Sequence, residues 1–472
     1  MMRRARFASI LALLLALPAC ADEAPATAPT PAVNVAIAPS PQRTDGDPAA
    51  GYDYLRYGDF VGSGVPLAVF LPFFEGATVT NELARTGDSA RLPRAFNVFD
   101  ITRDGRAVRV AGGTTCFGCH AASLNGRFVA GLGNWASSFT VDSSARVRLL
   151  DQLVRAQYGD DSPEWRAYLP FSRGAQAAGA AALAPFRGLN AAFLLEDAAA
   201  SHRSADLAWR DAAAWSTEAT AQAPRVASDT PAWWLLRKKN ALYYNGMGRG
   251  DFTRLLMQVS VVAVHDAAQA TEILSHFDDV LAWLLRLEAP RFTGAVDTAR
   301  AAQGAAVFGA RCAGCHGTYG EGGAYPNLLV PVANVGTDPL YAEQFMARGR
   351  LADWFNASWY AGNGAARLTP TRAYVAPPLD GVWATAPYLH NGSVPTLAAL
   401  LDSPTRPARW RRTFTDSTYD MERVGWPYTD GAAGDADTYD TAVAGYGNRG
   451  HTFGDALSAE ERAALLEYLK TL

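Results

Sequence analysis

The spacing of apolar residues along the chain predicts a mainly α fold. Near the C-terminus, one apolar stripe at helical intervals comprises Leu465, Tyr468, Leu469 and Leu472. Ser458 and Glu461 have the spacing of a capping box, in which each side chain accepts a backbone N–H of the other residue. A helix is therefore expected to begin at Ser458 and to bury one face.

A second helical stripe lies in the middle of the chain. It comprises Ile273, Phe277, Val280, Leu281 and Leu284. Because His265 and His276 fall in or beside this apolar run, we expect them to be core or surface residues rather than metal ligands. His202 lies in a polar stretch and is expected to be exposed.

Further along, Gly304, Phe308 and Cys312 are four residues apart and share one face of a predicted helix. Residues 107–120 are different, because they are glycine-rich and their pattern is extended. Two glycine pairs, Gly112-Gly113 and Gly322-Gly323, favour tight turns more than phosphate binding.

The N-terminus has the layout of an export signal. A basic segment precedes a short apolar core, Phe7–Leu17, and the stretch Leu17–Cys20 resembles a bacterial lipobox. Residues 1–20 are thus expected to be a lipoprotein signal peptide, with Cys20 as the lipidated first residue; ordinary cleavage nearby is the alternative. Arg3 and Arg4 suggest twin-arginine export, although the rest of that motif is missing.

Composition limits the remaining possibilities. The chain has 472 residues, 49% of them hydrophobic, which is enough for two or three domains. The net charge of −4 gives no indication of nucleic-acid binding or of an anionic membrane surface. Residues 21–50 are rich in Ala and Pro and predict a disordered tether, which would hold the protein on the periplasmic side of a membrane, or at the cell surface.

Two short motifs indicate the chemistry. The sequence CFGCH occupies 116–120, and CAGCH occupies 312–316. Paired cysteines can hold zinc or form disulfides, but neither reading explains a histidine directly after both pairs. Attachment of c-type haem explains all three residues, and it requires export. We therefore expect two covalently bound haems, attached through Cys116, Cys119, Cys312 and Cys315, with His120 and His316 as proximal iron ligands.

Residues 297–472 resemble a class I cytochrome c domain. In that family, a small residue on the first helix lets an aromatic-bearing last helix cross closely, which assigns these roles to Gly304 and Tyr468. Residues 51–150 are expected to form a divergent N-terminal haem domain. Residues 151–296 are then a long, partly helical insertion between the two cytochrome c-like domains.

The stretch APYLHNGSVPTL, 386–397, is similar to one shared by dihaem cytochrome c peroxidases, MauG-like enzymes and dihaem rubber oxygenases. Together with GHTFG at 450–454 and the terminal LLEYLKTL, it most resembles the rubber oxygenase branch. The resemblance implies that His451 is the distal ligand of the second haem, with His390 as second choice. It also implies that the His120 haem has an open side.

The middle segment holds Trp233 and Trp234, followed by the basic cluster 237–239. These residues are either aromatic core with a solvated basic edge, or a haem pocket whose cations pair with propionates. In rubber oxygenases a tryptophan lies near the active haem. The acidic loop 430–440 is a weak candidate for Ca²⁺ and is more typical of a solvated turn.

Three functions remain open on the sequence. The first is a rubber oxygenase-like enzyme that activates O2 to cleave an alkene. The second is a peroxidase that uses H2O2 and a periplasmic electron donor. The third is an electron carrier in which His276 or another side chain closes the first haem.

Overall fold

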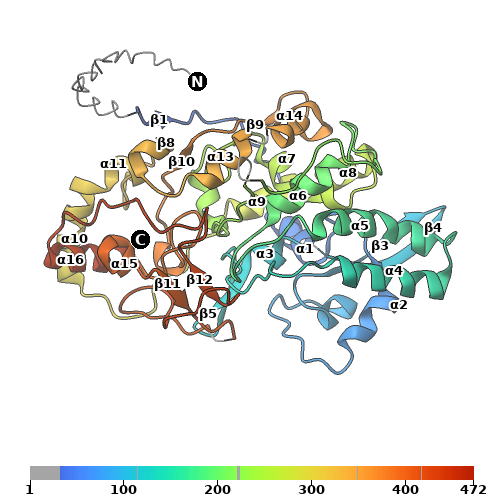
Figure 1. Ribbon diagram of the computed structural model, residues 1–472, viewed down its shortest axis with the longest axis horizontal. Helices are drawn as coiled ribbons and strands as arrows, with labels where there is room; N and C mark the ends of the chain where they lie inside the picture. Colours follow the sequence, from blue (N-terminus) through green and yellow to red (C-terminus); the bar gives the residue numbers. More distant parts are fainter. Residues whose placement is uncertain (1–31, 114, 221–223, 348, 416) are drawn as a thin grey trace, which may run out of the picture.

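The computed structural model describes residues 32–113, 115–220, 224–347, 349–415 and 417–472. These residues are mostly helical and form small antiparallel sheets of two or three strands, which confirms the predicted fold class at this level (Figure 1). The predicted signal peptide, including Cys20, lies outside the described residues. Among the helices that are described, none is both long enough and apolar enough to cross a membrane.

The C-terminal part is organised by two crossing helices, α10 (Thr298–Arg311) and α16 (Ala459–Leu469) (Figure 1). A Cβ added at Gly304 would lie 1.9 Å from the carbonyl oxygen of Ala464, so only glycine permits this crossing. Phe308 contacts Tyr468 with ring centroids 5.2 Å apart. The capping box of Ser458 and Glu461 is present as predicted.

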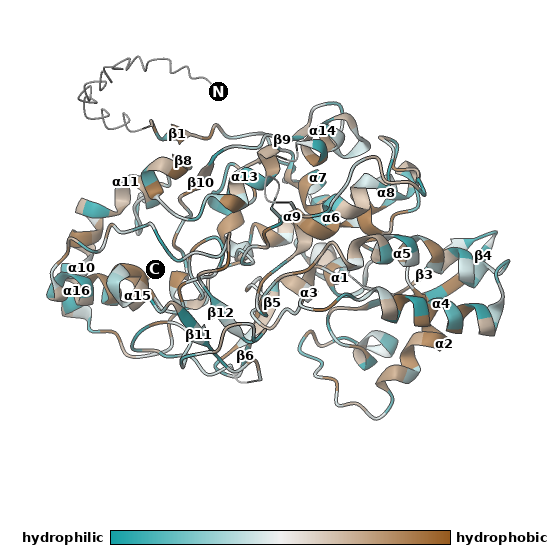
Figure 2. Cartoon of the chain, viewed as in Figure 1, coloured by the Kyte–Doolittle hydropathy of each residue, from teal (hydrophilic) through white to brown (hydrophobic). Residues whose placement is uncertain are grey.

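The N-terminal part is built on a three-stranded sheet of β2 (Val65–Pro66), β4 (Arg106–Gly112) and β3 (Asn97–Arg103). Helices α4 (Ser144–Tyr158) and α5 (Pro163–Gly179) lie beside it (Figure 1). Figure 2 shows both hydrophilic and hydrophobic residues along α4, as expected for a helix with one buried face. The extended run-in to CFGCH is therefore β4, which leads into the short helix α3 (Cys116–Cys119).

Part of the segment expected to be a tether packs on the protein. The strand β1 (Val35–Ala36) pairs with β8 (Leu328–Pro331), which in turn pairs with β10 (Ala373–Val375). The next helix, α1 (Pro48–Tyr57), is capped by Asp47 and packs on α9 (Phe277–Leu284). Residues 32–50 thus contact the C-terminal half through β1 and the middle segment through the start of α1, and Ile37 is buried.

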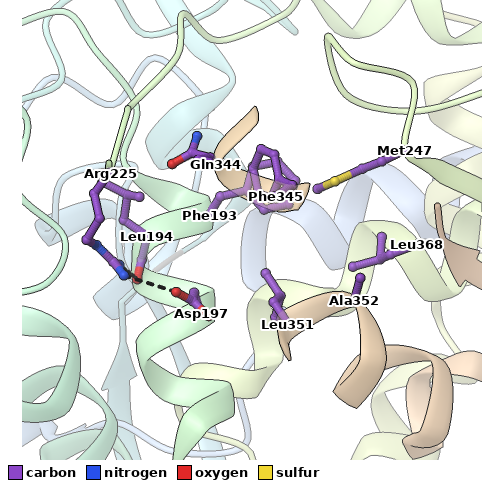
Figure 3. A pocket seen from close by; sticks show the side chains of 10 residues that line it. All are labelled: Phe193, Leu194, Asp197, Arg225, Met247, Gln344, Phe345, Leu351, Ala352 and Leu368. Carbon is purple, nitrogen blue, oxygen red and sulfur yellow. Dashed lines mark hydrogen bonds and ion pairs between the residues drawn. The ribbon is translucent and has the colours of Figure 1, made fainter. Parts of the chain in front are cut away.

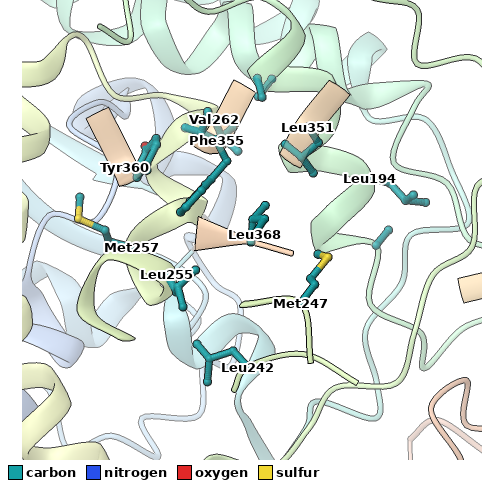
Figure 4. Close-up of a cluster of buried hydrophobic side chains, with 14 of the residues drawn as sticks. Leu194, Leu242, Met247, Leu255, Met257, Val262, Leu351, Phe355, Tyr360 and Leu368 are labelled. Atoms are coloured by element: carbon teal, nitrogen blue, oxygen red, sulfur yellow. The ribbon is translucent and has the colours of Figure 1, made fainter. Parts of the chain in front are cut away.

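The middle segment joins the two halves through a common core. It contributes α6 (Ala192–Ser201), α7 (Phe252–Leu256) and α8 (Ala267–Leu274), and all five residues of the predicted second stripe are buried. Leu194, Leu255 and Met257 pack against Phe355 and Leu368 of the C-terminal half (Figure 4). The remaining elements are α2 (Leu67–Phe70), β5 (Ala121–Leu124), β6 (Arg127–Ala130), β7 (Gly248–Gly250), α11 (Ala313–His316), α12 (Val332–Val335), α13 (Leu340–Ala347), α14 (Arg350–Ala357), β9 (Ala366–Leu368), α15 (Leu397–Leu401), β11 (Arg409–Arg411) and β12 (Thr438–Asp440), together with short 3₁₀ helices.

Candidate haem-binding sites

The first CxxCH motif opens onto a large cavity. The single turn of α3 brings Cys116, Cys119 and His120 to the wall of a cavity of about 550 Å³. This volume is in the range typical of cofactor sites, about 300–1,000 Å³. Much of the wall is apolar and comes from the middle segment, including Phe193, Leu236 and Leu256. The residues expected to form an insertion therefore supply one side of this site.

His120 is fixed by aromatic packing. Its ring stacks on Trp233 with centroids 4.5 Å apart and an interplanar angle of 17°. Burial lowers the pKa of His120 to about 4, and the nearby carbonyl of Pro231 opposes this only in part. The imidazole is therefore neutral at physiological pH, which is the form that binds iron.

The described lining of this cavity offers neither a second histidine nor a methionine as a haem ligand. Among the described residues that line it, His120 is the only histidine and there is no methionine. His276 is exposed and stacks on Tyr54 with centroids 4.3 Å apart, and His265 is exposed beside Asp266. His202 is half-buried against Trp209. Closure of the first haem by His276 therefore has no support in this geometry.

The cavity also holds ionisable groups that the sequence analysis missed. Burial raises the pKa of Glu196 to about 8 and that of Asp229 to about 7. Burial lowers the pKa of Lys239 to about 8. Glu196 is thus a protonated carboxyl at neutral pH. Its position, an acid in the apolar run FLLEDAAA of α6, is the one signal in the sequence.

The three residues of the basic cluster 237–239 have two different environments. Lys238 and Arg237 lie 2.7 and 3.7 Å from the carboxylate of Asp380. Lys239 lines the cavity instead, and it makes no ion pair with an acidic side chain in the described part of the chain. A partly buried ammonium facing a haem-sized cavity suits one haem propionate.

The second CxxCH motif lies opposite His451. The ring centroids of His316 and His451 are 6.1 Å apart. Metal–nitrogen bonds of about 2.0–2.1 Å on opposite sides of one ion place two imidazole centroids about 6 Å apart, so this spacing accommodates an iron between them. The Nδ1–H of His316 donates to the carbonyl of Pro377 at 2.8 Å, which leaves Nε2 free to bind metal.

His451 is held in an unusual backbone conformation just before α16. Its φ is +46°, and its N–H donates to the carbonyl of Val335 at 2.7 Å. Burial, His316 and the charge of Arg406 together lower the pKa of His451 to about 4. The ring is therefore neutral and ready to act as a ligand.

His390, the second choice for this position, has a different environment. It is buried and stacks on Tyr374 with centroids 4.1 Å apart, and its Nε2 lies 3.1 Å from the Tyr374 hydroxyl. Its main-chain carbonyl accepts the N–H of Asp229 from the wall of the first cavity. His390 thus packs in the core next to the first site, and the ring that faces His316 is that of His451.

The two sites are connected through the tryptophan pair. Trp233 contacts His120, and the indole N–H of Trp234 donates to the carbonyl of Asp380 at 2.8 Å. A short backbone segment leads from Asp380 back to Pro377, which accepts the hydrogen bond from His316. Trp234 does not line the first cavity and lies on the side of the second site.

The alternative metal sites receive no support. The four cysteines of the motifs are free, and the described residues contain no group of three or more His, Cys, Asp or Glu side chains that could hold a metal ion. In the acidic loop 430–440, arginines contact three of the four carboxylates: Arg187 contacts Asp437, Arg409 contacts Asp440, and Arg411 contacts Asp435. These pairs favour the predicted solvated turn over a calcium loop.

A second pocket, next to α6, is too small for a cofactor. Its volume of about 20 Å³ suits a single water molecule. Asp197 and Arg225 form an ion pair with N and O atoms 3.0 Å apart, which is drawn as a dashed line in Figure 3. Neighbouring residues on α6 thus divide their roles, since Glu196 faces the large cavity and Asp197 forms this ion pair.

Two family models match parts of the C-terminal half of the chain. Residues 301–374, which include CAGCH, match the cytochrome c family. The chain contains a cytochrome c domain. Residues 373–411, which include His390, match a family described as RoxA-like, cytochrome c-like. With the two CxxC motifs, these matches support c-type haem as the cofactor.

Two curated proteins of Sinorhizobium fredii are similar over longer stretches. The chain is 35% identical to uncharacterized protein y4iJ over 242 residues, which cover 38% of this chain and 40% of that protein. It is 28% identical to uncharacterized protein y4iM over 310 residues, which cover 55% of this chain and 68% of that protein. The chain thus spans about two fifths of the length of the first relative.

Proposed function

We propose that this chain is an exported dihaem cytochrome that acts as a redox enzyme, with different tasks at its two sites. The observation that supports this most strongly is the contrast in coordination. His120 faces a cavity of about 550 Å³ whose described lining contains no second histidine, whereas His316 faces His451. A haem with a free iron position can activate dioxygen or peroxide, and a haem with two histidine ligands is suited to electron transfer.

The residues around His120 support such chemistry. The neutral imidazole, stacked on Trp233, would hold the metal in one orientation. Much of the cavity wall is apolar, and a site from which such a wall excludes water protects reactive oxygen species from side reactions. Glu196 keeps a proton inside the cavity up to about pH 8 and can donate it to a bound oxygen atom. The Trp233–Trp234 pair supplies a path for electrons from the second site.

The favoured reaction is oxidative cleavage of a hydrophobic alkene such as polyisoprene. In it, one molecule of O2 adds its two oxygen atoms across a C=C bond and leaves two carbonyl groups, with no external electron donor. The RoxA-like match and the resemblance to rubber oxygenases support this choice. The apolar residues Phe193, Leu236 and Leu256 suit such a substrate.

A peroxidase reaction is the second candidate, and Glu196 favours it. Reduction of H2O2 to two water molecules consumes two electrons and two protons, so it needs a proton donor at the cavity and a periplasmic electron donor. The protonated carboxyl of Glu196, in the cavity that His120 also lines, meets the first need. The lipid anchor expected at Cys20 would keep the protein in the compartment that supplies the second.

Turnover measurements on the full-length diheme protein separate these functions. An oxygenase consumes O2 with an alkene and forms carbonyl products without a donor. A peroxidase oxidises a reduced cytochrome when peroxide is added, and Glu196→Gln should slow it by about 10²–10⁴-fold. His276→Ala, at an exposed position, serves as the control variant. Reversible reduction with neither activity would contradict an enzymatic role and indicate an electron carrier.

A further inference from the structure

Arg406 is held by hydrogen bonds to backbone carbonyls. It follows α15 and is half-buried, and within the described chain it lies in no salt bridge with an acidic side chain. A guanidinium group carries five N–H donors. In this structure all five meet backbone carbonyl oxygens, drawn from two separate segments of the chain.

The first segment is the C-terminal end of α15. The Nε–H of Arg406 donates to the carbonyl of Ala399 at 3.2 Å, and one Nη2–H donates to that of Leu400 at 2.9 Å. The last carbonyls of a helix have no partner within the helix and carry partial negative charge, so a cation binds them well. This contact fixes the guanidinium on a rigid element.

The second segment is the loop that carries His451. The Nη1 group donates to the carbonyls of Asn448 and Gly450, both at 2.7 Å. The second Nη2–H donates to the carbonyl of His451 itself at 3.0 Å. The loop also lies close to Gly336, since a Cβ at Gly450 would lie 2.2 Å from the carbonyl carbon of Gly336. Arg406 and this close contact together clamp the loop.

From this arrangement we propose that Arg406 is a positioning residue: it holds His451 as distal ligand of the second haem and raises the reduction potential of that haem. The inference rests on the His316/His451 coordination in the proposed function. A fixed positive charge near the iron disfavours the oxidised state, which carries one more positive charge than the reduced state. The clamp prevents His451 from leaving the iron when external ligands compete.

Three variants separate geometry from charge. Arg406→Gln removes both the charge and the fork of donors. Arg406→Lys keeps the charge but loses the planar fork of donors. The reduction potential of the second haem should therefore stay close to the wild-type value, while the His451 loop is held less firmly. Arg462→Gln is the control. Arg462 donates to the carbonyls of Leu457 at 2.7 Å and Gly454 at 3.5 Å and lies 3.5 Å from the carboxylate of Asp402, but it makes no hydrogen bond to residues 448–451 within the described chain.

The measurements are potentiometry of the second haem and binding of carbon monoxide to the reduced protein, each on samples with two haems per chain. For Arg406→Gln, the ratio of reduced to oxidised second haem at fixed potential should fall about tenfold, which is about 59 mV for one electron. Carbon monoxide should bind the second haem in Arg406→Gln and Arg406→Lys but not in Arg462→Gln. If Arg406→Gln does not accumulate with both haems, carbon monoxide binding to the second haem of Arg406→Lys tests the inference by itself.

Wild-type potential and carbon monoxide resistance in both Arg406 variants would overturn the inference. His451→Ala distinguishes this failure from failure of the proposed function. If His451→Ala makes the second haem high-spin while Arg406 variants behave as wild type, only the role of Arg406 is wrong. If His451→Ala leaves the spin state of that haem unchanged, the proposed His316/His451 coordination is wrong, and the inference about Arg406 is wrong as well.

Discussion

The imidazole rings of His316 and His451 face each other with centroids 6.1 Å apart and an interplanar angle of 61°. One residue ends the second CxxCH motif, and the other stands just before the last helix. His120, the corresponding residue of the first motif, faces a cavity and stacks on Trp233. The two motifs thus recur in surroundings that predict different coordination, and hence different reactivity, at the two irons.

Replacement of His451 tests the coordination of the second haem. His451→Ala should convert that haem from low-spin to high-spin, because it removes one of the two ligands. His390→Ala should leave the spin state unchanged and lower the free energy of unfolding by about 2–5 kcal/mol, because it empties a buried position against Tyr374. Absorption spectra and urea unfolding check both results. A spin-state change in His390→Ala alone would reverse the assignment.

Replacement of Trp234 tests the connection between the sites. Trp234→Phe loses the hydrogen bond to the Asp380 carbonyl and should slow electron equilibration between the haems after rapid reduction. Trp383→Phe is a matched control, since its buried indole N–H also donates to a single carbonyl at 2.8 Å, that of Pro290. Equal rates in the two variants would show that electrons take another route.

The buried carboxyl of Glu196 predicts a pH dependence of stability. Burial raises its pKa from 4.5 to about 8. Between pH 4.5 and about 8, the folded state keeps a proton that the unfolded state has released. The free energy of unfolding therefore falls as the pH rises through this range. Above about pH 8 this carboxyl has no further effect. At 1.36 kcal/mol per pKa unit, the total fall is up to about 5 kcal/mol.

Glu196→Gln should flatten this dependence, since glutamine does not titrate. Urea unfolding at about pH 5 and about pH 8 measures it for wild type and variant. Glu321→Gln, at an exposed carboxyl, controls for the change in net charge. Parallel pH profiles for wild type and Glu196→Gln would contradict a protonated carboxyl in the cavity.

The helix crossing predicts opposite effects at two glycines of α10. Gly304→Val places side-chain atoms against the backbone of Ala464 and should lower the free energy of unfolding by about 1–3 kcal/mol or more. Gly309→Ala should raise it by up to about 1 kcal/mol, because nothing lies near that position and alanine favours helix. Thermal unfolding compares them. Equal stability of the two variants would contradict the close crossing.

Local signals in the sequence were sufficient for several features. The capping box at Ser458, the stripe over 273–284 and the extended run-in to CFGCH depend on neighbouring residues, and all three are present. Gly304 and Tyr468 were assigned through the resemblance to cytochrome c, and they meet in the structure as that family requires.

Features that depend on distant contacts could not be read in this way. The apolar run around Glu196 marks an unusual acid but not the cavity that it faces, and nothing near Arg406 in the sequence shows that it binds the His451 loop. Residues 32–50 have the composition of a tether, yet β1 pairs with β8, which lies far along the chain. The partner of His316 came from a family resemblance, because the spacing of two histidines does not determine their distance in a fold.

The most direct test of the account is low-temperature electron paramagnetic resonance of the ferric protein, with haem content measured on the same sample. The account predicts two haems per chain, one with a high-spin signal from the His120 site and one with a low-spin signal from the His316/His451 site. Two low-spin signals from a sample with both haems would contradict the open first site.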